Sequence, residues 1–162
     1  MSLNYSSTQE RDTEKREIMA KVEIDVNQLP AGLTKKEFVN LPELKSQRSW
    51  FTWAGIVGIV TGLLGFVTVG QAAQLQAQGY MVNSGLVMFY GILSFVSLAL
   101  GIALIVTKES KVAYALGIVG LVFAVVAIAT GGTVGAGIIG TILAVFGARK
   151  IDTLWAAYQA RG

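Results

Sequence analysis

Ionisable side chains, which carry most of the chemistry of membrane-embedded proteins, are nearly missing from the centre of this sequence. From Ser49 to Ala148 the charged residues are Lys108, Glu109 and Lys111. The sequence also has no cysteine and no histidine, so it lacks disulfides, thiol chemistry and the commonest metal ligand and general base. Proton relays and ion-coupled transport depend on ionisable residues inside the membrane. We therefore predict no catalytic, cofactor-binding or metal-binding residue, and a protein that is not an enzyme.

Hydroxyl and amide side chains are the polar groups that remain. A hydroxyl in an apolar helix can bond to a facing helix or to the carbonyl four residues before it. We expect this role here, with a polar pore lining as the alternative. The hydroxyl residues in question are Thr52, Thr61, Thr68, Ser94, Ser97, Thr133 and Thr141. Gln71, Gln74 and Gln78 recur at helical spacing, which predicts either a solvated loop or a short helix that contacts a partner.

Glycine and alanine recur at intervals of three and four residues in the same stretch. This spacing places small residues on one face of a helix, where two backbones can approach closely. In lipid, such close approach allows dispersion contacts and weak hydrogen bonds to hold helices together. The sequence therefore predicts helix-packing seams. The residues that form them are Gly55, Gly58, Gly62, Gly65, Gly117, Gly120, Gly132, Ala136, Gly140 and Ala144.

The elements that carry these seams are predicted to be membrane-spanning helices. Of 162 residues, 53% are hydrophobic and 14% are charged, which is typical of membrane proteins. A bilayer core requires about 20 apolar residues per helix. Residues 112–148 are uncharged and would form a helix about 55 Å long, so we expect the chain to fold back at Thr130–Thr133. The sequence predicts an all-α integral membrane protein whose domain 49–148 holds four transmembrane helices in two hairpins, at about 50–70, 85–106, 112–130 and 133–148.

Residues 1–48 are predicted to form a cytoplasmic N-terminal arm that is partly disordered. Val22, Ile24 and Val26 alternate with acidic residues, the pattern of a half-buried strand. A turn is expected at residues 29–32.

Thr34 and Glu37 have the spacing of a capping box, which predicts a short helix over 35–40 that ends before Pro42. The arm has too few apolar residues for a core of its own. We therefore expect residues 18–48 to be either a linker on the membrane surface or a docking segment for a cytoplasmic partner.

The tail, residues 149–162, is predicted to be an amphipathic cytoplasmic segment. Its apolar residues recur at i, i+3, i+4 and i+7 from Ile151, the pattern of a helix lying in the membrane interface. Tryptophan and tyrosine concentrate at the two interfaces of a membrane. The predicted interface anchors are Trp50, Trp53, Trp155 and Tyr158.

The distribution of lysine and arginine predicts the orientation. These residues lie in the arm, in the loop 107–111 and in the tail, whereas the other two loops have none. Four spans with both termini in the cytoplasm place every positive charge on one side, as the positive-inside rule requires. The first 17 residues lack the apolar segment of a signal peptide. We expect a multi-pass protein of a bacterial inner membrane or an equivalent bilayer.

The function that these features favour is that of a non-enzymatic integral membrane subunit. Such a protein would be an accessory or scaffold component of a larger complex, packing through its small-residue seams on other membrane subunits or on copies of itself. It would contact membrane lipids and would not bind nucleic acid. The alternatives are a self-associating passive pore or permeability factor, and a sensor that moves its N-terminal arm in response to the bilayer.

Overall fold

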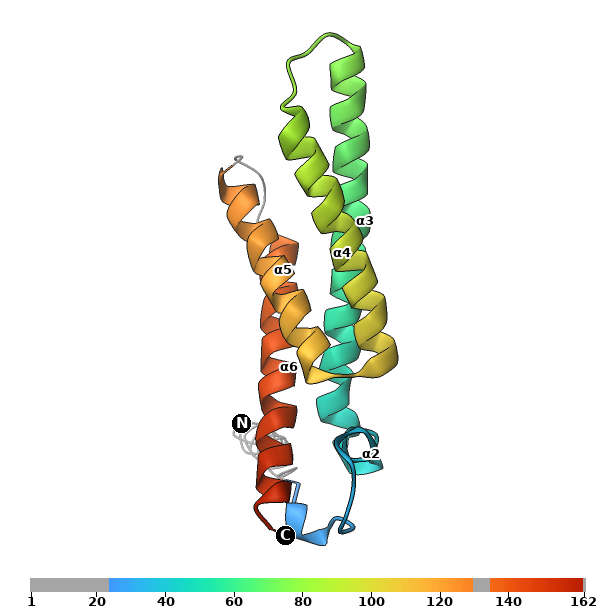
Figure 1. Cartoon of the computed structure of the whole chain (residues 1–162), viewed down its shortest axis with the longest axis vertical. Helices are drawn as coiled ribbons and strands as arrows, with labels where there is room; N and C mark the ends of the chain where they lie inside the picture. Colours follow the sequence, from blue (N-terminus) through green and yellow to red (C-terminus); the bar gives the residue numbers. More distant parts are fainter. Residues whose placement is uncertain (1–23, 130–134, 162) are drawn as a thin grey trace, which may run out of the picture.

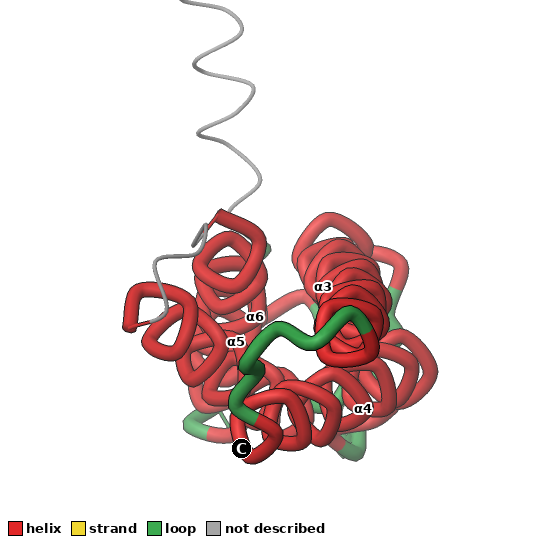
Figure 2. The backbone as a smooth tube through the Cα atoms, turned by 90° about the horizontal axis from the view of Figure 1, so that it is seen from above, coloured by secondary structure: helices red, strands yellow, loops and turns green. Residues whose placement is uncertain are grey.

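The part of the chain that the structure describes is mostly helical. A computed structural model describes residues 24–129 and 135–161, and these two ranges contain no strand. Four long helices lie side by side in an elongated bundle (Figure 1). Viewed from above, they surround a common axis, with α3 beside both α4 and α6 (Figure 2). The four are α3 (Lys45–Ala77), α4 (Ser84–Thr107), α5 (Ser110–Ala129) and α6 (Gly135–Gln159).

The ends of α4 follow from local chemistry. The Asn83 side chain caps its first turn by accepting a hydrogen bond from the Leu86 amide at 3.2 Å. At the other end Lys108 adopts a left-handed conformation, with φ of +53°, and stops the helix. Ser110 then begins α5, so the predicted tight charged loop consists of Lys108 and Glu109.

Three of the helices, α3, α4 and α5, are long and apolar enough to cross a membrane. They correspond to the first three predicted spans. α6 does not meet the same criterion among the described residues. Its described apolar part, residues 135–148, is about 21 Å long, and Arg149, Lys150 and Asp152 follow directly. The fourth span therefore remains a prediction.

The first helix is longer than the predicted span at both ends. α3 continues through Gln71 to Ala77, so the connection between the first two predicted spans shrinks from residues 71–84 to residues 78–83. Glutamine, alanine and leucine are good helix formers, and an uncharged polar segment does not by itself end a helix. Gly79, with φ of +87°, makes the turn that follows.

The α3–α4 pair extends well beyond the neighbouring ends of α5 and α6 (Figure 1). With 33 residues, α3 is about 50 Å long, which exceeds the roughly 30 Å hydrocarbon core of a bilayer. At the opposite end of the molecule, residues 24–44, which precede α3, pack against the bundle. The two ends of the bundle therefore differ: one is a bare helical pair, and the other is covered by residues 24–44.

Residues 24–44 form three short helical elements, η1 (Val26–Gln28), α2 (Lys35–Val39) and η2 (Pro42–Leu44). The predicted capping box of α2 is confirmed, because the Thr34 hydroxyl and the Glu37 amide, and the Glu37 carboxylate and the Thr34 amide, are bonded reciprocally. The strand predicted for Ile24 and Val26 is wrong, since Val26 begins a 3-10 helix; Val22 lies outside the described residues.

The arm packs against the far end of α6 rather than standing apart from the bundle. Two of its large side chains, Phe38 and Leu44, have no exposed surface, and the same is true of Ile151 on α6. α6 itself runs without interruption past Arg149 and Lys150 to Gln159. The tail is thus the end of a bundle helix, and its apolar face is covered by the arm instead of lying outward as an interfacial helix would.

Candidate functional sites: the glycine interface and the terminal cluster

Glycines on α3 form the face that it presents to α4. A Cβ atom placed at Gly62 would lie 2.7 Å from the Ser94 carbonyl oxygen and 3.0 Å from the Leu98 amide nitrogen. One at Gly55 would lie 2.8 Å from the carbonyl oxygen of Gly101. These neighbours are backbone atoms, so they cannot turn aside as a flexible side chain would. Any side chain at these positions would therefore push the two helices apart.

Two other glycines of α3 face side chains of neighbouring helices. A Cβ at Gly58 would lie 2.9 Å from Leu116 Cδ1 on α5, and one at Gly65 would collide with the Ser94 hydroxyl on α4. All four glycines of α3 that the sequence pattern selected are therefore buried inside the chain's own bundle.

The contact between α5 and α6 depends on a reciprocal pair of glycines. A Cβ at Gly120 would lie 2.9 Å from the Gly137 carbonyl oxygen, and a Cβ at Gly137 would lie 2.9 Å from the Gly120 carbonyl oxygen. Gly117, one turn earlier on α5, faces Val145 at 3.0 Å. The two backbones meet here as closely as α3 and α4 do.

α6 has a second small-residue face, which packs on α3. A Cβ at Gly140 would lie 3.0 Å from Val57 Cγ1, and one at Gly147 would lie 2.9 Å from Trp50 Cβ. Ala144 has no exposed surface. Of the other predicted seam residues, Gly132 and the side chain of Ala136 lie outside the described part of the structure.

We call the glycines at these close helix–helix contacts the glycine interface. It includes three glycines that the sequence pattern did not select. Gly101 belongs to a sparser series of small residues on α4, which predicts a seam less clearly. Gly137 and Gly147 lie outside the four-residue spacing through Gly140, because that spacing follows only one of the two faces of α6. The members are Gly55, Gly58, Gly62 and Gly65 on α3, Gly101 on α4, Gly117 and Gly120 on α5, and Gly137, Gly140 and Gly147 on α6.

Hydroxyl groups add two hydrogen bonds between helices. Ser97 Oγ on α4 donates to the Gly58 carbonyl oxygen on α3 at 2.9 Å, in a buried position. Thr141 Oγ1 on α6 lies 3.0 Å from the Gly117 carbonyl oxygen on α5 and 2.9 Å from its own Gly137 carbonyl oxygen. Thr68 and Ser94 instead donate to the carbonyl four residues before them. These four hydroxyls make the two kinds of bond that we expected from the sequence, and Thr133 lies outside the described residues.

The centre of the bundle is nearly filled. One small cavity between the helices has room for roughly one water molecule. Residues of all four helices line it: Val57, Gly58, Thr61, Ser97, Leu116, Gly120, Gly137 and Gly140.

Aromatic rings form the second site, where the arm meets the end of α6. The Phe38 ring lies edge-on to Trp155, with centroids 5.2 Å apart, and 5.3 Å from the Tyr158 ring. Trp155 and Tyr158 stack at 5.4 Å. Edge-to-face and offset-stacked rings at such distances attract each other beyond the area that they bury. We call this set the terminal cluster: Leu29, Phe38, Val39 and Leu44 from the arm, with Ile151, Leu154, Trp155 and Tyr158 from α6.

Tyr158 joins the backbone of the arm to α6. Its hydroxyl accepts a hydrogen bond from the Leu33 amide at 3.0 Å and donates one to the Pro30 carbonyl oxygen at 2.7 Å. These bonds span the predicted turn at residues 29–32, which Gly32 completes with φ of +78°. Arg161 lies over the Tyr158 ring and donates to the Val26 carbonyl oxygen. The arm is therefore held by directional bonds as well as by apolar contact.

An ion pair closes the edge of the terminal cluster. Lys35 Nζ on α2 lies 2.7 Å from Asp152 Oδ1 on α6. Partial burial on its own raises the pKa of Asp152, but the hydrogen bond and charge of Lys35, with the hydroxyls of Ser110 and Tyr114, outweigh it and lower the pKa below its usual range. The carboxylate is thus held in its charged form.

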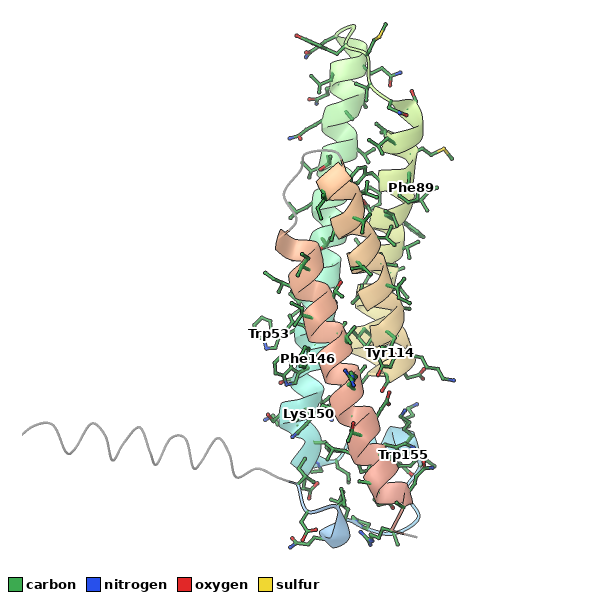
Figure 3. All side chains as sticks on the ribbon, turned by 90° about the vertical axis from the view of Figure 1, so that its left-hand side faces the viewer. Trp53, Phe89, Tyr114, Phe146, Lys150 and Trp155 are labelled. Atoms are coloured by element: carbon green, nitrogen blue, oxygen red, sulfur yellow. The ribbon has the colours of Figure 1, made fainter. Side chains whose placement is uncertain are left out.

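The four predicted interface anchors divide into two pairs. Trp50 and Trp53 on α3 point outward, with 38% and 60% of their surface exposed. Figure 3 shows Trp53 on the outer side of the bundle and Trp155 at the end that the arm covers. Trp155 and Tyr158 contact the arm of the same chain, and Tyr158 is 8% exposed. The first pair is therefore open to a surrounding lipid, and the second pair is occupied within the protein.

Comparisons with protein-family models, with curated proteins and with solved structures find no match to the chain. The function is therefore argued from these two sites and from the surface that they leave free.

Proposed function

We propose that the protein is a non-enzymatic integral membrane subunit, an accessory or scaffold component of a larger membrane complex. It crosses the bilayer four times, as two hairpins, with both termini in the cytoplasm. The observation that supports this proposal most is a bundle whose helices pack closely at glycines, with no Asp, Glu, Lys, Arg or His from Trp50 to Thr107 or from Val112 to Ala148. Such an interior offers no group for proton or ion coupling.

The glycine interface determines where a partner could bind. Its close contacts are made inside one chain, so the seams are already filled and cannot also receive helices of another subunit. A partner helix would have to pack on the outward apolar surface of the bundle or on the projecting end of the α3–α4 pair. That end is uncharged between Gln71 and Ser84, and its Tyr80 and Met81 side chains are exposed. It is the surface that we assign to the partner.

The pore alternative receives less support from the positions of the hydroxyl groups. A path between several copies would require free hydroxyls on the outer surface. Ser94 and Ser97 are buried, and the exposed Thr68 donates its hydroxyl to the Leu64 carbonyl of its own helix. The central space inside one copy holds about one water molecule. We therefore place the subunit hypothesis ahead of the pore hypothesis.

Gentle extraction of the tagged protein from its native membrane tests the proposed function. The purified complex is weighed by native mass spectrometry, and every component is identified. We expect a fixed ratio of this chain to at least one other membrane protein, and we expect Met81→Gln, at the projecting end, to reduce recovery of that partner. Gln76→Asn, on the same end of α3, is the matched control. A pure monomer or homo-oligomer would refute the accessory role.

Topology is tested separately with single cysteines, because the native sequence contains none. Cysteines at Ser2 and Gln159 should react with a membrane-impermeant reagent from the same side, and one at Gln78 from the opposite side. Reaction of Gln159→Cys from the side of Gln78→Cys would leave an odd number of spans and refute the four-span topology.

A further inference from the structure

One outward stripe of α6 has the chemistry of a lipid-binding surface. Ile138, Ile142, Phe146 and Lys150 follow each other at four-residue intervals, so they lie on one face of the helix. The first three are exposed apolar side chains, with 66% of Phe146 accessible, and the fourth is an exposed cation. This order, apolar for about two turns and then positive, matches an acyl chain that ends in a negatively charged headgroup.

The neighbouring helix adds an aromatic side to the stripe. Trp53 of α3, Phe146 and Lys150 project from the same side of the molecule, in this order toward the end covered by the arm (Figure 3). Gly147 holds α6 against α3 at this level, because Trp50 Cβ would lie only 2.9 Å from a Cβ there. The two exposed rings therefore flank a place where the helices are in close contact, and tryptophan favours the interfacial region of a bilayer.

The charge of Lys150 is not neutralised by the protein. Within residues 24–129 and 135–161 it forms no ion pair, and the nearby carboxylate of Asp152 is bonded to Lys35. An ammonium group at headgroup level attracts anionic lipids, and basic sites beside transmembrane helices are known to hold their headgroups. A zwitterionic lipid offers the same phosphate with its own positive charge beside it, which weakens the attraction.

We propose that this surface, Lys150 with Phe146 and Trp53, binds an anionic phospholipid in preference to a zwitterionic one. The proposal rests on the membrane placement given above, though not on the accessory role. The phosphate lies against the Lys150 ammonium, and an acyl chain lies along Phe146, Ile142 and Ile138. The lipid thereby contacts both α3 and α6 at the level where they cross.

Fluorescence quenching in vesicles tests the proposal on the full chain. The protein is reconstituted into phosphatidylcholine vesicles that contain either brominated phosphatidylcholine or brominated phosphatidylglycerol, and the quenching of tryptophan emission gives the relative association of the two lipids. A Trp53→Phe variant identifies the part of the signal that comes from Trp53. We expect a several-fold preference for phosphatidylglycerol at Trp53.

Variants of single lysines separate a defined site from general attraction by positive charge. Lys150→Gln should lower the preference about fivefold, the effect of one cation near the surface, and Lys150→Arg should keep it. Lys111→Gln, on α5, is the matched control and should leave it unchanged. An equal loss in the Lys150→Gln and Lys111→Gln variants, or an unchanged preference in Lys150→Gln, would overturn the proposed site. Absence of quenching by both brominated lipids would overturn the membrane placement as well.

Discussion

Replacing Gly62 by alanine tests whether backbone contact holds α3 and α4 together. The added Cβ would lie 2.7 Å from the Ser94 carbonyl oxygen, whereas ordinary contacts begin at 3.4 Å. The helices would have to separate by about 0.7 Å along this line, because the opposing atom belongs to the backbone. The change thus removes close contact along the interface as well as at one residue.

The expected cost follows from two opposing effects. Overpacking a tight interior costs about 1–3 kcal/mol, whereas exchanging glycine for alanine inside a helix gains up to about 1 kcal/mol. With the full glycine-to-alanine gain subtracted, we expect Gly62→Ala to lower the free energy of unfolding by up to about 2 kcal/mol. Gly70→Ala is the matched control, since it lies on the same helix and has no atom within 4 Å of the added Cβ. It should be neutral or slightly stabilising.

Unfolding by SDS in mild detergent micelles, followed by tryptophan fluorescence, measures both variants. Gly62→Ala should unfold at a lower SDS fraction than the wild type, and Gly62→Leu at a lower one still. If Gly62→Ala and Gly70→Ala unfold at the same SDS fraction, the α3–α4 contact is looser than described and the reasoning fails.

Three further predictions concern hydrogen bonds and charge. Ser97→Ala, which removes the bond to the Gly58 carbonyl, should lower the free energy of unfolding by about 0.6 kcal/mol in the same SDS titration; an unchanged midpoint would mean that the bond contributes nothing. Tyr158→Phe should weaken the attachment of the arm by about 1 kcal/mol and speed amide hydrogen exchange over residues 29–39. Tyr80→Phe, at an exposed residue, is the control and should leave this exchange unchanged. Equal exchange in the two variants would argue against the bonds of the Tyr158 hydroxyl to Leu33 and Pro30. Because the pKa of Asp152 is lowered by folding, its contribution is present above the usual value of 3.8 and is lost as the pH falls through the lower folded value. With the intrinsic exchange rate at each pH divided out, the protection of the arm's amides should therefore fall in acid by an amount that corresponds to less than about 1 kcal/mol. Asp152→Asn should lower this protection already at neutral pH and remove the part of the pH dependence that Asp152 causes; the part from Glu37, whose pKa is lowered by its hydrogen bonds with Thr34, should stay.

The sequence predicted those features that depend on local chemistry. The capping box at Thr34, the turn at residues 29–32 and the charged loop at Lys108 each depend on a few neighbouring residues, and each is present. The three confirmed apolar helices follow from length and composition alone. The end of α3 could not be predicted in the same way, since an uncharged run of good helix formers after Gly70 is compatible with helix and loop.

The pairing of the arm with α6 required information that no single segment contains. Residues 24–44 have apolar side chains without a core, and residues 151–158 have an apolar stripe without a partner. Each pattern alone is typical of a surface segment. The two complete each other only when the fold brings Leu33 within reach of Tyr158, 125 positions later. Likewise the spacing of small residues identified packing faces on the helices, but it could not say that the facing helix belongs to the same chain.

The terminal cluster makes the molecule sensitive to the angle between two of its helices. Half of the cluster is carried by the chain that enters α3, and the other half by α6, which contains neither glycine nor proline from Ala148 to Gln159. Beyond Gly147, α6 is therefore a rigid helix that moves as one piece. A tilt of about ten degrees there would move Tyr158 by about 3 Å, comparable to the length of its bonds to Leu33 and Pro30. A small change in how α3 and α6 cross is thus converted into the opening of an apolar surface at the end of the molecule.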